Sequence, residues 1–311
     1  MKVTAPALES VQRAAALVAP HIRQTPVIRL DRGRLKLESL QPTGSFKVRG
    51  FFNAALRADA QRRTAGLMTV SAGNAALACA HVARHLGVPC RVVMFDTAPK
   101  AKRAGVERLG ATVIPMAFAE LLDWLTNERW QAEPELFIHP FADDAVIAGH
   151  GTLALELAEQ CPEVDTVIVP VGGGGLILGV AATIKALRPG VEVVGVQSDG
   201  YPLWRDAFRA GGPVSLTPAT IADGTTGPFT PAMFELLGAH VDRWITVPES
   251  RLRAAVAELA VQGKVVAEGA GALAFAALGM LGSGAEAVGV VSGGNIDPSR
   301  VAELLLEAQT A

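Results

Sequence analysis

Lys47 is the residue of this chain best suited to covalent chemistry. It stands among small and apolar neighbours in residues 43–50, which read TGSFKVRG. An ammonium group that loses its surrounding water has a lowered pKa, and the free amine then attacks carbonyl carbons. Lysines beside glycines are also common in ordinary turns, so the meaning of Lys47 depends on the other segments of the chain.

Four consecutive glycines, Gly172, Gly173, Gly174 and Gly175, follow a predicted strand and precede a predicted helix. Backbone N–H groups and a helix N-terminus can surround a phosphate there without obstruction by side chains. A dinucleotide site would need the spacing G-x-G-x-x-G and an acidic residue about 20 residues on. Glu192 falls near that distance, but the contiguous glycines favour a simple phosphate site. A close crossing of helix and strand is the structural alternative.

Ser71, Ala72, Gly73 and Asn74 form a second predicted connection from a strand to a helix. Asn74 could cap this helix, and the surrounding N–H groups could receive a carboxylate. The loop therefore suits the carboxyl group of an amino acid, although a capped helix alone would also explain it.

Ser292 ends a predicted strand and precedes Gly293-Gly294-Asn295. Its hydroxyl could hydrogen-bond a heteroaromatic nitrogen. Unlike a carboxylate, a hydroxyl would leave a pyridine ring largely unprotonated and make it a milder electron sink. Such a ring favours elimination.

The elements that must position these residues alternate between Val/Ile-rich runs and helical patterns, which indicates an α/β protein with mainly parallel sheets. One set of strands is predicted at 67–71, 90–95, 111–115 and 136–139, with helices starting near Asn74, Pro99 and Ala119. A second set is predicted at 166–171, 191–197, 243–247 and 287–292, with helices at 175–187, 250–262 and 269–281. Residues 26–38 also look extended, and the helix after Ser45 should run to about Ala60.

The two sets of strands predict two domains, each a mainly parallel sheet flanked by helices. Residues 1–65 and 140–311 would form the larger domain, which packs the N-terminal third on the later sheet. Residues 66–139 would form a smaller inserted domain that carries the loop from Ser71 to Asn74. A ligand should lie between the two, at the carboxyl ends of the strands.

Composition excludes several classes of function. The 311 residues are half apolar and carry a net charge of -2 with scattered Lys and Arg, which favours small molecules and protein subunits over nucleic acid or a membrane surface. The uncharged stretches 166–184 and 269–285 are broken by glycines, so we expect no membrane span. Residues 1–20 lack the features of a signal peptide, and the three cysteines suit buried thiols, so the protein should be cytoplasmic.

Together the four chemical segments resemble the fold-type II (tryptophan synthase beta-like) pyridoxal-phosphate enzymes, in the branch of the threonine/serine dehydratases and serine racemase. The order T-G-S-F-K-x-R-G, S-[SA]-G-N, V-G-G-G-G and S-G-G-N is the order of that family. Residues 148–152 (AGHGT) and 221–224 (IADG) also match, so the resemblance covers nearly the whole chain.

The resemblance implies that Lys47 binds pyridoxal 5'-phosphate covalently and then transfers protons. It also implies roles for the residues around it: Phe46 beside the ring, Asn74 at the ring hydroxyl, Ser292 at the pyridine nitrogen, Gly172, Gly173, Gly174 and Gly175 around the phosphate, and Ser71, Ala72, Gly73 and Asn74 at the substrate carboxylate. The implied reaction is α,β-elimination from a β-hydroxy amino acid such as L-threonine or L-serine, which releases a 2-oxo acid and ammonia. A homodimer is also implied.

Some positions depart from the family pattern. Ala72 replaces the second base of the racemase branch, so elimination should prevail over racemisation. Ala75 and His150 stand where the family usually has His and Gln, which puts the substrate in doubt. Residues 197–198 (QS) lack the acidic group of the racemase metal site, so no metal is expected there. Because the chain stops at Ala311, we expect no C-terminal regulatory domain.

Other polar side chains have spacings that resemble metal or catalytic sites but have simpler structural explanations. His81 and His85 have the i, i+4 spacing of metal ligands, but no third ligand accompanies them, so they are interpreted as helical histidines. Asp143 is expected to cap a helix rather than pair with Asp144 in catalysis. Glu268 either lies near the cofactor, as an acidic residue often does in the family, or stabilises a helix dipole.

Two other readings stay open. The same cofactor could support β-replacement, γ-elimination or a lyase reaction on a different hydroxylated amino acid. A catalytically silent binding protein could also keep this fold, given Ala75 and His150.

Overall fold

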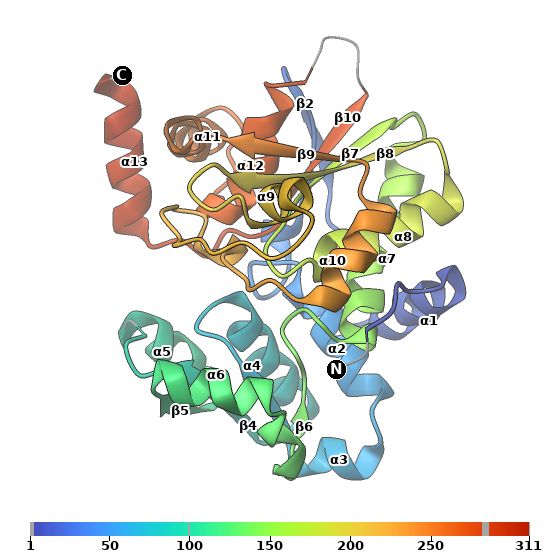
Figure 1. Cartoon of the computed structure of the whole chain (residues 1–311), viewed down its shortest axis with the longest axis vertical. Helices are drawn as coiled ribbons and strands as arrows, with labels where there is room; N and C mark the ends of the chain where they lie inside the picture. The colour runs from blue at the N-terminus through green and yellow to red at the C-terminus, as the bar shows by residue number, and fades with distance from the viewer. Residues whose placement is uncertain (1–2, 99, 282–285, 311) are drawn as a thin grey trace.

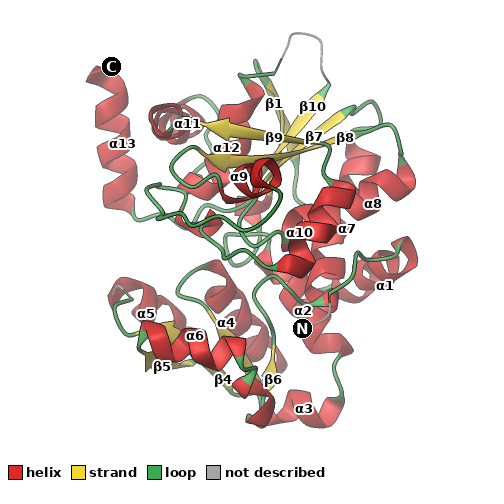
Figure 2. Ribbon diagram, viewed as in Figure 1, coloured by secondary structure: helices red, strands yellow, loops and turns green. Residues whose placement is uncertain are grey.

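Two sheets organise the computed structural model, which describes residues 3–98, 100–281 and 286–310. The larger sheet has the strand order β1-β2-β10-β7-β8-β9 and the smaller sheet the order β5-β4-β3-β6. Neighbouring strands of the described chain are parallel, except that β1 and β2 form an antiparallel hairpin. Figure 1 shows the two sheets in separate halves of the molecule, and Figure 2 shows the helices around them. The predicted α/β class is confirmed.

The strands of the larger sheet are β1 (Val27–Leu30), β2 (Gly33–Leu37), β7 (Thr166–Pro170), β8 (Glu192–Ser198), β9 (Arg243–Val247) and β10 (Ala287–Val291). Those of the smaller sheet are β3 (Leu67–Val70), β4 (Cys90–Phe95), β5 (Thr112–Met116) and β6 (Leu136–Phe137). All lie within two residues of their predicted positions where a strand was predicted, and the extended segment 26–38 is the hairpin β1–β2.

The helices before β7 are α1 (Leu8–Val18), α2 (Lys47–Arg57), α3 (Ala60–Ala65), α4 (Asn74–Leu86), α5 (Lys100–Glu107), α6 (Phe118–Thr126) and α7 (Asp144–Gln160). Those after it are α8 (Gly175–Leu187), α9 (Leu203–Ala210), α10 (Pro231–His240), α11 (Glu249–Val261), α12 (Gly269–Leu278) and α13 (Pro298–Thr310). Short 3-10 helices are η1 (Glu38–Leu40), η2 (Arg129–Ala132) and η3 (Asp223–Thr225).

The larger sheet is buried on both faces, which explains its continuous apolar runs. In β7, Val167 and Val169 join a core with residues of α7 and α8, whereas Ile168 joins a core with residues of α11 and α12. This alternation follows from the period of two along a strand. The smaller sheet also has apolar clusters on both faces, one built with α2 and α4 and one with α6.

Some boundaries differ from prediction. Helix α2 ends at Arg57, before the predicted Ala60, because Ala58 takes an extended conformation and Asp59 caps α3. Helix α12 ends at Leu278, three residues earlier than expected. The predicted helix start at Pro99 lies outside the described residues, and α5 is described from Lys100.

The N-terminal third packs on the later sheet, as predicted, because β2 pairs with β10. The four strands of the smaller sheet fall within 66–139, yet Phe51 and Phe52 of α2 share a core with α4. These contacts do not decide where a domain boundary falls, so the division at 66 and 139 stays a prediction.

The three cysteines are free and buried, in agreement with the predicted buried thiols. Within the ranges that the structure describes, no helix is both long and apolar enough to cross a membrane.

Candidate active site

A cavity of about 1320 Å³ lies where the carboxyl ends of β3, β7 and β10 meet the N-termini of α2, α4 and α8. All the residues that the sequence assigned to a site line it: Phe46, Lys47, Ser71, Ala72, Gly73, Asn74, Gly172, Gly173, Gly174, Gly175 and Ser292. Segments more than 200 residues apart in sequence thus meet in one place.

The tetraglycine loop has a geometry that suits a bound anion. It follows β7 and leads into α8, with Gly174 at the N-cap in a left-handed conformation (φ 91°) that glycine adopts without strain. A Cβ on Gly173 would lie 2.4 Å from the Phe141 ring, so a side chain would not fit. In the described structure the N–H groups of residues 172–175 have no hydrogen-bond acceptor. These free donors at the positive end of a helix favour a bound phosphate.

Lys47 is the first residue of α2, and its Nζ donates a hydrogen bond to the carbonyl oxygen of Pro140 at 2.5 Å. The same nitrogen lies 5.0 Å from the centre of the Phe46 ring. Burial lowers the pKa of Lys47 to about 8. At that pKa a larger share of the amine is neutral and reactive near pH 7 than for an exposed lysine.

Helix α2 is held in place by buried charges behind Lys47. The Arg49 guanidinium bonds both carboxylate oxygens of Glu38, at 2.7 and 2.8 Å, and Glu156 on α7 at 2.6 and 2.9 Å. Lys36 on β2 also bonds Glu156. The N–H of Phe46 donates to the carbonyl oxygen of Ser292 at 3.0 Å, which ties the start of α2 to the end of β10.

The loop from Ser71 to Asn74 differs from its prediction in one detail. Asn74 does not cap α4: it is the first helical residue, Gly73 is the N-cap, and no side chain caps this end. Instead, the Ser71 hydroxyl accepts a hydrogen bond from the N–H of Gly73 at 3.0 Å. Within the described chain the N–H groups of Asn74 and Ala75 have no acceptor, so they are available to a carboxylate in the cavity.

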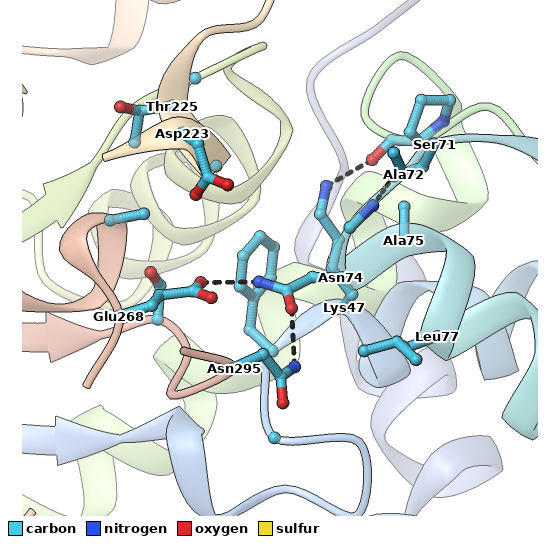
Figure 3. A pocket seen from close by; sticks show the side chains of 18 of the residues that line it. Lys47, Ser71, Ala72, Asn74, Ala75, Leu77, Asp223, Thr225, Glu268 and Asn295 are labelled. Carbon is cyan, nitrogen blue, oxygen red and sulfur yellow. Dashed lines mark hydrogen bonds between the residues drawn. The ribbon is translucent and has the colours of Figure 1, made fainter. Parts of the chain in front are cut away.

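The Asn74 side chain is held from the opposite side of the cavity (Figure 3). Its Nδ2 donates to Glu268 Oε1 at 2.7 Å, and its Oδ1 accepts from Asn295 Nδ2 at 2.7 Å. Glu268 is nearly buried, and burial raises its pKa to about 7 against the opposing effect of the Asn74 hydrogen bond. Of the two interpretations of Glu268, the structure supports a place in the cavity.

Ser292 is 4% exposed and lines the cavity directly after β10. Among the residues that the structure describes, nothing accepts from or donates to its hydroxyl, so the group is free to meet a ligand.

Two neutral imidazoles lie near Lys47. The His139 Nδ1 accepts from the N–H of Ala142 at 2.9 Å, and burial together with the Lys47 charge lowers the His139 pKa to about 3. His150 is fully buried with its ring 4.7 Å from the Phe46 ring, edge to face. Burial and the charges of Lys47 and Arg49 hold the His150 pKa well below its usual range.

The residues that were interpreted as structural from the sequence, His81, His85 and Asp143, make the following contacts. His81 and His85 pack around Phe52, where His21 brings a third imidazole 4.8 Å from the ring of His85. No group of three or more His, Cys, Asp or Glu in the described ranges could hold a metal ion. The Asp143 side chain accepts from the N–H of Val146, which confirms the predicted helix cap.

Residues 197–198 make protein contacts of their own. The Gln197 side-chain oxygen accepts from the N–H of Trp204 at 2.9 Å, and the Ser198 hydroxyl bonds Glu249. The prediction that no metal binds at this position remains a prediction.

The cavity fits pyridoxal phosphate. An amine with a lowered pKa can bond the aldehyde, the free N–H donors at α8 can hold the phosphate, and the free Ser292 hydroxyl can meet a ring nitrogen. Each of these groups lines one continuous cavity, and Gly173 leaves no room for a side chain beside the Phe141 ring.

Sequence reasoning missed several residues of the cavity. The carbonyl of Pro140 holds Lys47, and Phe141 packs against the tetraglycine loop. Both follow β6, and the rule that ligands lie beyond the carboxyl ends of parallel strands could have indicated them. Asn295 lies in the matched segment after β10, but its contact with Asn74 joins residues 221 positions apart and left no local signal.

Comparisons with known proteins agree with this geometry. Residues 18–293 match the family model described as pyridoxal-phosphate dependent enzyme. The L-threonine ammonia-lyase of Thermotoga maritima is 40% identical over 285 residues, which cover 87% of this chain and 69% of that protein.

Two solved structures are similar along almost the whole chain. Maize serine racemase superposes with a TM-score of 0.89 at 29% identity, covering 99% of both chains. The threonine deaminase of T.th. superposes with a TM-score of 0.85 at 35% identity, covering 94% of this chain and 99% of that one. With its fold, its cavity and the match to the family model in agreement, this chain belongs to the pyridoxal-phosphate dependent enzymes.

Proposed function

We propose that the protein is an ammonia-lyase that converts L-threonine, and also L-serine, to a 2-oxo acid and ammonia by α,β-elimination. The similar L-threonine ammonia-lyase and threonine deaminase support the reaction. The observation that carries the proposal is Lys47, an amine with a lowered pKa in the same cavity as the phosphate cradle and the Ser71–Asn74 loop. That loop has Ala72, which cannot exchange a proton, so Lys47 acts alone.

Each residue of the cavity is assigned a role in binding or catalysis according to its position. The bound cofactor supplies an electron-withdrawing ring that stabilises negative charge at the α carbon of the substrate. Once the substrate amine has replaced it on the cofactor, Lys47 Nζ takes the α proton, and the β-hydroxyl takes up a proton and leaves as water. The released enamine then takes up water and gives the 2-oxo acid and ammonia. The other assignments are those of the sequence: the N–H groups of Gly172, Gly173, Gly174 and Gly175 for the phosphate, Phe46 beside the ring, Ser292 for the pyridine nitrogen, Asn74 for the ring hydroxyl, and Ser71, Ala72, Gly73 and Asn74 for the substrate carboxylate.

Ala72 sets the expected balance between elimination and racemisation. Racemisation requires a proton donor on the face of the α carbon opposite Lys47. The methyl side chain of Ala72 has no proton to donate. With L-serine in heavy water, we expect pyruvate and ammonia to form much faster than D-serine. Formation of D-serine at a rate comparable to pyruvate would contradict the assignment of Lys47 as the sole base.

The direct test measures 2-oxo acid and ammonia from a panel of β-hydroxy amino acids, including substrates larger than threonine. Wild-type protein should form both products in equal amounts, and Lys47→Ala should lose the borohydride-reducible bond to the cofactor and the activity. Lys185→Gln is the matched control, since Lys185 pairs with Asp242 away from the cavity. A Lys47→Ala protein that kept a reducible bond would refute the proposal.

The same assay separates the other readings. Incorporation of a second nucleophile at the β carbon without release of ammonia would indicate β-replacement. Bound cofactor with no spectral change for any β-substituted amino acid would indicate a silent binding protein.

The assembly and the location of the protein also belong to the proposal. We propose a cytoplasmic homodimer, in line with the family resemblance and the buried cysteines. Sedimentation equilibrium of purified protein tests the dimer, and fractionation of cells that express a tagged chain tests the location.

We further propose that residues 66–139 form a separate small domain. Lys102 of α5 bonds Asp223 of η3 at 2.7 Å, and this exposed ion pair bridges the smaller sheet's helices to the other half of the molecule. Substrate-dependent changes in hydrogen exchange confined to that segment would support the division.

A further inference from the structure

Residues 148–152 (AGHGT) match the family pattern, but the roles above do not use them. They lie in the middle of α7 and are buried throughout. Helix α7 contacts α2 on one side and α8 on the other. Since α2 begins with Lys47 and α8 begins at the tetraglycine loop, α7 stands between the helices that carry the two ends of a cofactor site.

The contact with α2 is made by backbone. A Cβ on Gly149 would lie 2.6 Å from the carbonyl oxygen of Arg49 and 2.7 Å from the Cα of Gly50. A Cβ on Gly50 would in turn lie 2.7 Å from the carbonyl oxygen of Val146. The first turn of α2, which includes Lys47, therefore rests directly on α7 with no room for a methyl group.

The contact with α8 is equally close. A Cβ on Gly179 would lie 2.4 Å from the carbonyl oxygen of Ile147 and 2.8 Å from the nitrogen of Gly151. Gly179 stands one helical turn after Gly175, the last glycine of the cradle. The helix that presents the N–H donors thus packs on α7 at Ile147 and Gly151, next to and within the same five-residue segment.

Side chains of α7 fix the same contact with α2. Arg49 Nη1 donates to Thr152 Oγ1 at 3.1 Å and to Glu156 Oε1 at 2.6 Å. The His150 ring lies edge to face against Phe46, the residue next to Lys47, and neither of its nitrogens has a partner within the described structure. Polar contacts and close packing therefore both fix the separation between the start of α2 and helix α7.

We propose that α7 is a spacer that sets the separation between Lys47 and the phosphate cradle, and that Gly149, Gly179 and Arg49 are positioning residues for the covalent bond to the cofactor. The inference rests on the proposed function only in taking Lys47 and the cradle as the two attachment points. An α-helix is hydrogen-bonded along its length, so a change of contact at α7 would shift the N-terminal residues of α2 and α8 with the rest of each helix. Misplacement of reacting groups by about 1 Å can cost roughly 100-fold in rate.

The test compares two aldehydes that differ in the phosphate. Pyridoxal phosphate must meet Lys47 and the cradle together, whereas pyridoxal needs only Lys47. In cofactor-free wild-type protein, the rate of bond formation with Lys47, trapped by borohydride and located by peptide mass, should be much higher for pyridoxal phosphate. In Gly149→Ala and Gly179→Ala this ratio should fall by roughly tenfold or more, while the rate with pyridoxal stays within about twofold.

Gly190→Ala is the matched control, because nothing lies within 4 Å of the position of a Cβ there. Its ratio should equal that of the wild type. A general loss of stability would lower both rates together, which separates a structural defect from a change in spacing. Folded Gly149→Ala and Gly179→Ala proteins with the wild-type ratio would overturn the inference.

Should neither glycine variant fold, Arg49→Lys decides the question. Lysine keeps the buried charge but cannot make the same set of bonds to Glu38, Thr152 and Glu156. Its ratio should fall by about threefold or more, since a lost buried hydrogen bond carries a cost of that order or larger, and Arg91→Lys in the smaller sheet should leave the ratio unchanged. Equal ratios in the two arginine variants would refute the spacer. Wild-type protein that bonds pyridoxal phosphate but forms no 2-oxo acid would refute the proposed function and leave this inference standing.

Discussion

The two loops that run from a strand into a helix at the cavity are built by different means. The tetraglycine loop after β7 is fixed by its own backbone packing, since added methyl groups would meet Phe141 or Met233 within 2.4 to 2.7 Å at Gly173, Gly174 and Gly175. At Gly73, in the loop after β3, a methyl group would meet nothing within 4 Å. That loop is held by side chains, through Asn74, Glu268 and Asn295.

The difference matches the ligands that the two loops are proposed to receive. A cofactor stays through many turnovers, so its phosphate site gains from a rigid shape. A substrate enters and leaves in every cycle, and hydrogen bonds between side chains can be exchanged at small cost. The variants below test this contrast, from the largest expected effect to the smallest.

A methyl group in the rigid loop should have the largest effect. Gly175→Ala places a Cβ 2.4 Å from the Phe141 carbonyl oxygen, so the start of α8 must move. We expect the affinity for pyridoxal phosphate, measured by absorbance titration, to fall by about 100-fold. Gly73→Ala should leave that affinity within about twofold and instead raise the KM for threonine. Equal losses of cofactor affinity in the two variants would remove the contrast.

Lys47 lies between the loops, and its reactivity should depend on pH. Only the neutral amine attacks an aldehyde, and burial lowers the Lys47 pKa from 10.5 to about 8. The rate at which cofactor-free protein bonds pyridoxal phosphate should therefore rise with pH and reach half its maximum near pH 8. Stopped-flow absorbance between pH 6 and 10.5 checks this, and a midpoint near 10 would show that the amine is well hydrated.

Removing the side-chain tether should weaken substrate binding more than cofactor binding. Asn74→Ala deletes the bonds to Glu268 and Asn295 and leaves Glu268 without its donor. The expected cost is about 1.4 kcal/mol, which corresponds to a rise in KM of roughly tenfold. Asn127→Ala on the surface is the control and should keep the wild-type KM. A pure fall in kcat at constant KM would point to a role in the chemical step.

The smallest effect is expected for Glu268 and concerns stability. Its pKa is raised to about 7 in the folded protein, so its contribution to stability is present below the unfolded value of 4.5 and is lost as pH rises through 7. Glu268→Gln should therefore raise Tm relative to the wild type at pH 8 and leave it nearly unchanged at pH 4. The exposed Glu235→Gln serves as control. A Tm difference of the same size at both pH values would contradict the raised pKa.

The sequence predicted the strands well because buried parallel strands carry continuous Val/Ile runs, as in β7 and β10. The lining of the cavity was predictable for a related reason. Each site residue follows a strand or begins a helix, and such positions gather at one edge of a parallel sheet.

Contacts between distant residues were not predictable in this way. Nothing local at Asn74 indicates Glu268, which lies 194 positions away, and the Asn74 side chain bonds Glu268 instead of capping α4. The hydrogen bond from Lys47 to the Pro140 carbonyl also leaves no signal in the sequence, because any residue type can supply a backbone oxygen. The early end of α2 depended on Asp59, a capping residue whose signal was present but overlooked.

The place of β10 in the larger sheet has a consequence for how the protein is made. The hairpin β1–β2 leaves the ribosome early, but β2 bonds to β10, which is synthesised about 250 residues later. Until β10 is synthesised, this edge of β2 is unpaired. The interval is roughly 10 to 50 s at ordinary rates of translation. An unpaired edge strand is a site of aggregation, so the nascent chain should need protection over that interval. A ribosome stalled before Ala287 would hold a chain whose lysine exists but whose active site does not.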